Sequence, residues 1–173
     1  MILYIMFKFL KKDIFTKTQN SVLYKKNNYI IKQTNILDTN QYNILKNIKH
    51  SNIIKIIHNY CDLDYNYDIM KYYKNGDLYD NITSNMYNLN NRIKNQNIIE
   101  KLINPIYYIH KKNIVHLDLK LENYLIDNNG DFILCDFDIS KYHKNLYNYL
   151  EKTDTIGTKA YMAPELFEGY YSK

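Results

Sequence analysis

The segment HLDLKLENYLID, residues 116–127, holds charged and amide side chains at a spacing that admits two interpretations. In a half-buried strand, alternate residues face opposite sides, with the leucines on the buried face. Alternatively, Asp118, Lys120 and Asn123 lie in a loop that holds them for chemistry, and the leucines anchor that loop. A carboxylate can act as a base, an ammonium can offset negative charge, and an amide oxygen can bind a metal ion.

The residues downstream favour the loop. Two short apolar runs, YLID and FILC, flank the turn NNGD. Asn129 and Gly130 supply positive φ angles, so this stretch predicts an antiparallel hairpin. Because the residue entering the first strand lies beside the residue leaving the second, Asn123 and Asp136 should be neighbours. Their oxygens suit Mg²⁺, and with Asp118 close by the predicted chemistry is phosphoryl transfer.

The elements that must position these residues divide the chain into a strand-rich part and a helical part. The first 72 residues are predicted to be mostly strands, with a tight turn at Asn27–Asn28 and one helix within residues 38–50. A turn at Gly76 follows. Residues 95–112 then predict a longer helix, which Pro105 would interrupt or kink.

Composition is that of a globular protein. The chain has 173 residues, 46% of them hydrophobic, which is enough for one core or for two small lobes that share a cleft. The net charge of +5 would permit an anionic partner. The lysines are scattered rather than clustered in a stripe, so no nucleic-acid partner is expected.

The sequence also argues for an intracellular, cytoplasmic protein. Its start, MILYIMFKFLKK, lacks the basic region and cleavage site of a signal peptide, so a buried first strand is predicted there. No stretch approaches the roughly 18 apolar residues that span a bilayer, and no membrane partner is expected. Cys61 and Cys135 are too few and too isolated for a disulfide framework or a zinc site.

Taken in order, the motifs resemble those of the protein kinase family. HLDLKLEN is similar to the catalytic loop, CDFD to the metal-binding Asp-Phe-Gly motif, and GTKAYMAPE to the end of the activation segment. YIIK looks like the strand that bears the phosphate-binding lysine, and IMKYYKNGDL like the hinge between two lobes. The lysine two residues after Asp118 resembles the serine/threonine branch. The resemblance begins at about Phe7.

The resemblance implies an α+β, two-lobed protein-kinase-like fold within one partial protein kinase domain, residues 1–173. Residues 1–72 would form an antiparallel sheet N-lobe with one helix, residues 73–76 the hinge, and residues 77–173 a mainly helical C-lobe. Because the chain stops nine residues after Pro164, we expect this C-lobe to be incomplete. A partner or a downstream segment is expected to cover its exposed face.

The resemblance also implies roles for an enzyme that uses ATP and Mg²⁺ to phosphorylate a serine or threonine of a protein substrate. Asp118 would be the base for the substrate hydroxyl, and Lys120 would stabilise the transferring phosphoryl group. Asn123 and Asp136 would hold Mg²⁺, and Lys32 would hold the α- and β-phosphates. Three further residues would bind the nucleotide: Ile30 and Leu125, on either side of the adenine, and Met70.

Two departures from the family pattern concern the nucleotide site. Residues 16–21 align with the glycine-rich loop, but threonine or serine replaces all three glycines, which limits how closely backbone N–H groups approach phosphate. Gln41 stands where the family carries the glutamate that pairs with Lys32. It can hydrogen-bond the ammonium but brings no charge. Asp38 is a candidate substitute.

Two more departures lie beside the catalytic residues. Leu117 replaces an arginine that in many kinases receives an activation-loop phosphate. Asp138 replaces the glycine of Asp-Phe-Gly; it tolerates left-handed backbone, and it places a second carboxylate near the metal. These departures keep a second hypothesis open. The chain would then be a pseudokinase or kinase fragment that binds nucleotide weakly or not at all and acts through protein contacts.

Other polar residues near these motifs have structural interpretations. His116 is expected to brace Phe137 rather than to act as a base, and Cys135 is expected to be a buried strand residue. Three hydroxyl residues are candidate phosphorylation sites by position, with solvated loop residues as the alternative: Ser140, Thr153 and Thr155.

Overall fold

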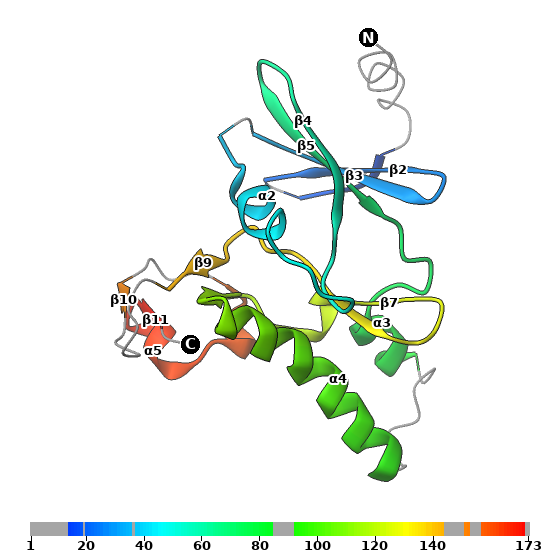
Figure 1. The fold of residues 1–173 in the computed structure, drawn as a ribbon, viewed down its shortest axis with the longest axis vertical. Helices are drawn as coiled ribbons and strands as arrows, with labels where there is room; N and C mark the ends of the chain where they lie inside the picture. Colours follow the sequence, from blue (N-terminus) through cyan, green and yellow to red (C-terminus); the bar gives the residue numbers. More distant parts are fainter. Residues whose placement is uncertain are drawn as a thin grey trace.

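Strands dominate the first part of the chain, where a five-stranded antiparallel sheet has the order β1-β2-β3-β5-β4 (Figure 1). The computed structural model describes residues 14–18, 20–35, 37–84, 92–143, 151–152 and 157–171. The strands of the sheet are β1 (Ile14–Lys17), β2 (Val22–Lys26), β3 (Tyr29–Asn35), β4 (Ile56–Cys61) and β5 (Tyr65–Lys71). The expected strand within residues 1–12 lies outside the described residues.

The central strands β3 and β5 are buried on both faces of this sheet. On the outer face, Ile31, Tyr67 and Ile69 form an apolar cluster. The inner face carries the alternate residues, among them Lys32 and Asp68, which pair directly across the two strands. A tight turn joins β2 to β3 with Asn27 at a φ of 52°, as the Asn27–Asn28 prediction requires.

Among the described residues of this lobe, the one helix is the short α2 (Asn40–Leu45) (Figure 1). Ile44 and Leu45 bury its apolar side in the main core. The helix is shorter than residues 38–50. The chain has to turn after it so that residues 52–54 reach strand β8 (Phe132–Leu134), where the Ile54 N–H donates to the Leu134 carbonyl at 2.8 Å.

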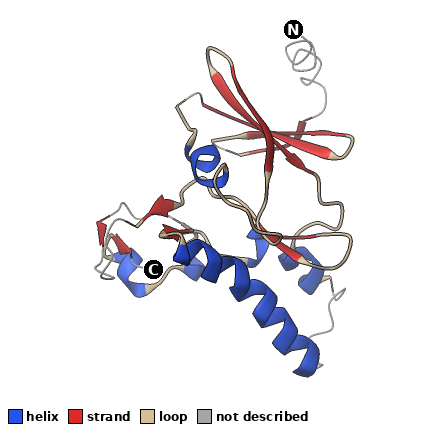
Figure 2. Cartoon of the chain, viewed as in Figure 1, coloured by secondary structure: helices blue, strands red, loops and turns tan. Residues whose placement is uncertain are grey.

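Helices are prominent in the second lobe (Figure 2). The long helix α4 (Arg92–Lys111) continues through Pro105, which lies buried within it, so the expected interruption does not occur. The other elements are α3 (Leu78–Thr83), β6 (Ile114–Val115), η2 (Leu121–Asn123), β7 (Tyr124–Ile126), β9 (Lys141–Tyr142), β10 (Glu151–Lys152), η3 (Lys159–Tyr161), α5 (Pro164–Phe167) and β11 (Tyr170–Tyr171).

The two lobes share one apolar core. Its buried members come from α2, from β5, from α4 and from the β7–β8 hairpin. Main-chain hydrogen bonds attach this hairpin on both sides: the Leu134 N–H donates to Asn52 (2.9 Å), and the Ile126 N–H donates to Gly76 (3.0 Å). The hairpin is therefore the joint between the sheet and the helical part. This architecture confirms the predicted α+β, two-lobed fold.

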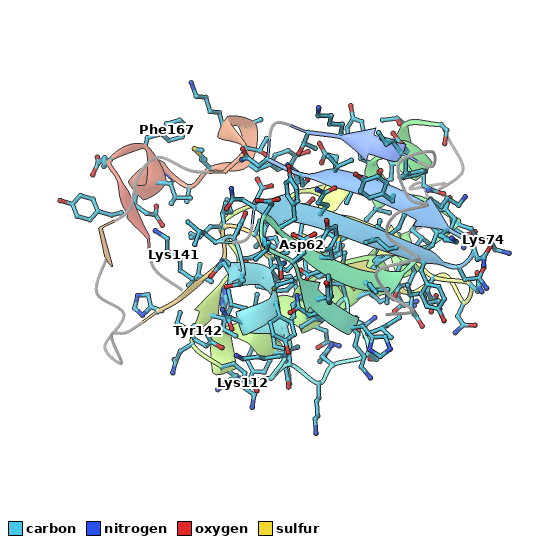
Figure 3. All side chains as sticks on the ribbon, turned by 90° about the horizontal axis from the view of Figure 1, so that it is seen from above. Asp62, Lys74, Lys112, Lys141, Tyr142 and Phe167 are labelled. Carbon is cyan, nitrogen blue, oxygen red and sulfur yellow. The ribbon has the colours of Figure 1, made fainter. Side chains whose placement is uncertain are left out.

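Seen from above, Asp62 lies over the sheet (Figure 3). Lys74 lies at one side of the molecule, and Phe167 of α5 lies at the opposite side. Within the described ranges, no helix is both long enough and apolar enough to cross a membrane.

Candidate active site

Residues 116–120 form a loop between β6 and η2, so the loop interpretation of HLDLKLEN is correct. Leu117 has a φ of 68°, a conformation that is uncommon for residues with a Cβ. Its side chain is buried with Val115 and packs against Ile139 and Leu166. The leucine thus anchors the loop, as predicted, while Asp118 lines the wall of a cleft.

Asp118 accepts hydrogen bonds on both carboxylate oxygens. Oδ1 accepts from the backbone N–H (2.9 Å) and the hydroxyl (2.7 Å) of Thr158. Oδ2 accepts from Lys120 Nζ (2.8 Å) and Asn123 Nδ2 (3.1 Å). Burial opposes ionisation, but the bonds from Lys120 and Thr158 outweigh it and hold the pKa of Asp118 below its usual range. The carboxylate is therefore ionised at neutral pH.

Thr158 is a site residue that the sequence analysis did not single out. Its hydroxyl donates to Asp118 and accepts from Lys120 Nζ at 2.9 Å, so it connects the two catalytic candidates. The signal was present, because Thr158 follows Gly157 at the start of GTKAYMAPE. Gly157 has a φ of 101°, and a Cβ there would lie 2.5 Å from the Leu117 carbonyl oxygen. Only glycine allows this close approach.

The β7–β8 hairpin places Asn123 and Asp136 together, as predicted. The Cys135 N–H donates to the Asn123 carbonyl at 2.9 Å, and Asp136 follows directly. Asp136 has a φ of 63°, so the left-handed residue of CDFD is the first aspartate and not Asp138. Strained backbone of this kind is typical of functional sites.

His116 packs as predicted. It is fully buried, and its ring centroid lies 4.7 Å from that of Phe137 in an edge-to-face arrangement. Nδ1 accepts from the Asp118 N–H (3.3 Å), which leaves Nε2 as the donor to the Cys135 carbonyl (3.0 Å). Burial lowers the pKa of His116, and burial raises the pKa of the Cys135 thiol. Both groups are thus uncharged parts of the support beneath the cleft.

Lys32 is buried, and two carboxylates bind its ammonium. Nζ lies 2.8 Å from Asp136 Oδ1 and 2.5 Å from Asp138 Oδ2. Burial disfavours the charged amine, but these carboxylates prevail and raise the pKa of Lys32. Burial also raises the pKa of Asp138 to about 6, against the opposing effect of Lys32, so Asp138 is ionised at neutral pH.

Gln41 does not form the hydrogen bond to Lys32 that its side chain would allow. The Gln41 amide donates to Asp68 Oδ2 (3.1 Å), and its oxygen accepts from the Phe137 N–H (3.2 Å). Among the described residues, the ion pairs of Lys32 are those with the two aspartates of CDFD, so Asp38 does not substitute either. The physical reason is the buried Asp68 carboxylate, which needs a donor.

A cleft of about 560 Å³ lies between the sheet and the hairpin. All six residues predicted to bind nucleotide or metal line it: Ile30, Lys32, Met70, Asn123, Leu125 and Asp136. Ile30 and Met70 pair across β3 and β5, and Leu125 comes from β7. A smaller adjoining hollow contains Asp118 together with Lys32 and Asp136. The fold therefore gathers the predicted residues around one continuous site.

The segment that replaces the glycine-rich loop also borders this cleft, through Thr16, Thr18 and Ser21. The Ser21 N–H donates to Thr18 Oγ1 (3.0 Å), and the Thr18 N–H donates to the Ser21 carbonyl (2.9 Å). Those two amides are already paired and do not point freely at a ligand. This agrees with the expectation that the loop holds phosphate less closely than glycines would.

The candidate phosphorylation sites differ in their placement. Ser140 is buried, and its hydroxyl donates to the His116 carbonyl at 3.0 Å, so it is not a solvated loop residue. Thr153 and Thr155 lie outside the described residues.

Sequence comparison finds similarity between this chain and known proteins. The family model of the protein kinase domain matches residues 11–173. Serine/threonine-protein kinase SIK1 of Mus musculus is 35% identical over 127 residues, which cover 73% of this chain and 16% of that protein. Calcium-dependent protein kinase 4 of Plasmodium falciparum (isolate 3D7) is 36% identical over 135 residues, which cover 75% of this chain and 24% of that protein.

The chain belongs to the protein kinase family. Members of this family are transferases that generally use ATP and Mg²⁺. The chain spans between 16% and 24% of the length of these curated relatives.

Proposed function

We propose that the chain is part of the kinase domain of an active serine/threonine protein kinase, which transfers the γ-phosphate of ATP to a protein hydroxyl. The convergence of Lys32, Asp118, Asn123 and Asp136 on one cleft carries this proposal. The N-lobe would extend over residues 1–72, the hinge over residues 73–76 and the C-lobe over residues 77–173.

The residues of the cleft suit Mg²⁺ and ATP. Asp136 exposes 41% of its side chain and offers a hard carboxylate oxygen. Asn123 uses its amide N–H groups on Asp118, and no hydrogen bond within the described residues uses its side-chain oxygen. Mg²⁺, when bound, offsets the charge of the phosphate oxygens. Lys32 would hold the α- and β-phosphates, and Ile30, Leu125 and Met70 would surround the adenine.

The chemistry assigned to the loop is a single displacement. The oxygen of a substrate serine or threonine forms a bond to the γ-phosphorus as the bond from phosphorus to the ADP oxygen breaks. Asp118 orients the hydroxyl and accepts its proton, and Lys120 neutralises charge on the transferring group. Since Asp118 already accepts bonds from Thr158 and Lys120, the hydroxyl has to replace part of that network.

Asp136→Ala tests this proposal, because a methyl group could not hold the Mg²⁺ that would offset the phosphate charge. We expect Mg²⁺-dependent transfer of labelled γ-phosphate to a serine/threonine peptide library to be lost. The matched control is Asp131→Ala, since Asp131 also pairs with a lysine, Lys101 (2.6 Å), but at the surface. Equal incorporation by wild type and Asp136→Ala would remove the site assignment.

The second candidate function is a pseudokinase that acts through protein contacts. The paired amides of Thr18 and Ser21 favour it, because they reduce the donors available to phosphate. Titration of the wild-type chain with Mg²⁺ and a fluorescent ATP analogue, together with the peptide transfer assay, distinguishes the two functions. Weak or undetectable binding of the analogue, with no transfer to any peptide, would support the pseudokinase.

A further inference from the structure

The helix α2 supplies no charge to Lys32. Its residue nearest the cleft, Gln41, is buried and uses its amide on Asp68 and its oxygen on the Phe137 N–H. A buried ammonium without a counter-ion is strongly unfavourable. The charge that stabilises Lys32 must therefore come from another element.

We propose that Asp138 is the residue that positions Lys32, with its carboxylate as the permanent counter-ion in place of an acid on α2. Oδ2 of Asp138 lies 2.5 Å from Lys32 Nζ. The side chain of Asp138 is 27% exposed, against 41% for Asp136, so Asp138 sits on the more enclosed side of the ammonium. Hydrogen bonds in which both groups are charged are among the stronger ones in proteins.

Asp136 and Asp138, the two aspartates that contact Lys32, have different roles in the proposed enzyme. Asp136 is the candidate Mg²⁺ ligand, and its charge is shared with the metal when ATP is bound. Asp138 then remains to hold the lysine. This consequence rests on the proposed kinase function, whereas the ion pair itself does not.

Although α2 brings no charge to Lys32, its side chains hold the backbone around Asp138 in place. Asn40 Nδ2 donates to the carbonyls of Asp138 (2.7 Å) and Ser140 (2.8 Å), and Gln41 accepts from the Phe137 N–H. Phe137 is fully buried against His116. These contacts fix the backbone on both sides of Asp138, so its carboxylate is held at Lys32 with little freedom to leave.

The test measures Lys32 directly, without nucleotide. In Asp138→Asn the side chain keeps its shape and loses its charge, so Lys32 loses one of its two ionic partners and its amine is held less firmly in the cleft. We expect labelling of Lys32 by an amine-reactive reagent, quantified by peptide mass spectrometry, to rise about tenfold. Asp138→Glu restores a carboxylate and should return labelling towards the wild-type level. Asp131→Asn, at the surface pair with Lys101, should leave Lys32 unchanged.

A second measurement connects the ion pair to function. Asp138→Asn should raise the KM for ATP about tenfold and leave the KM for the peptide substrate unchanged. If no variant transfers phosphate while Lys32 labelling still rises in Asp138→Asn, the proposed function fails and the counter-ion stands. Unchanged Lys32 labelling in Asp138→Asn, or the same rise in Asp131→Asn, overturns the counter-ion.

Discussion

At Gln41, a single amide group does what neither a carboxylate nor an ammonium could do. The nitrogen donates to the buried Asp68 carboxylate, while the oxygen accepts from the Phe137 backbone. Asn59 adds a second donor to Asp68 at 2.8 Å. A glutamate at position 41 would keep the acceptor and lose the donor. The residue identity therefore follows from its neighbours in β5, and not from Lys32.

Gln41→Glu should destabilise the protein, because it would place a second carboxylate beside Asp68. We expect the free energy of unfolding to fall by about 1–3 kcal/mol, the usual penalty when a buried polar group loses its partner. Urea denaturation followed by circular dichroism measures it. The double variant with Asp68→Asn restores a donor and should recover much of the loss. An unchanged midpoint in Gln41→Glu would contradict this interpretation.

At the scale of elements, the sequence predicts local features well. The turns at Asn27 and Gly130 and the long helix α4 follow from turn chemistry and apolar periodicity, which depend on residues close in the chain. The contacts of Thr158 with Asp118 join residues 40 positions apart; the motif GTKAYMAPE marks Thr158, but no local pattern shows that its partner is Asp118. The same holds for Gln41 and Asp68, since the buried charge on β5 decides the partner of the helix.

The segment that carries Thr158 depends on close contact with the catalytic loop. Gly157→Ala would bring a Cβ within 2.5 Å of the Leu117 carbonyl oxygen, at a φ that disfavours alanine. The segment has to move away, and Thr158 loses its place on Asp118. We expect kcat to fall at least tenfold while the affinity for a fluorescent ATP analogue stays within about twofold.

Gly169→Ala is the control for this prediction, because Gly169 also has a positive φ (79°) but follows α5. It introduces comparable backbone strain away from Asp118. Equal losses of kcat in both variants would assign the effect to strain in general.

At the scale of the whole molecule, the two lobes are not independent folding units. A single apolar cluster extends from α2 through β5 and the β7–β8 hairpin to α4. The hairpin contributes the fully buried Phe132 and Leu134, and both of its sides are hydrogen-bonded to the neighbouring segments. Loss of the hairpin would expose the apolar faces of both lobes at once.

Leu134→Ala should therefore weaken the entire molecule. Removing a fully buried leucine side chain destabilises a protein by about 2–5 kcal/mol. Thermal melts followed in the far and near ultraviolet should shift together to lower temperature. Leu63→Ala, at a leucine that is 95% exposed, should leave the melt unchanged. Two separate transitions in Leu134→Ala would show that the lobes unfold independently.

The hydrogen bonds from α2 to the segment 137–140 affect which substitutions such a sequence can accept during evolution. Asn40 and Gln41 bind main-chain atoms, which every amino acid possesses. The attachment of this segment therefore does not depend on which side chain stands at position 138. An acidic side chain at position 138 brings a negative charge to Lys32 without disturbing that attachment. The acid that the family carries at the position of Gln41 is then not required. The counter-ion of Lys32 can therefore stand either on α2 or on the segment 137–140, with Lys32 itself unchanged.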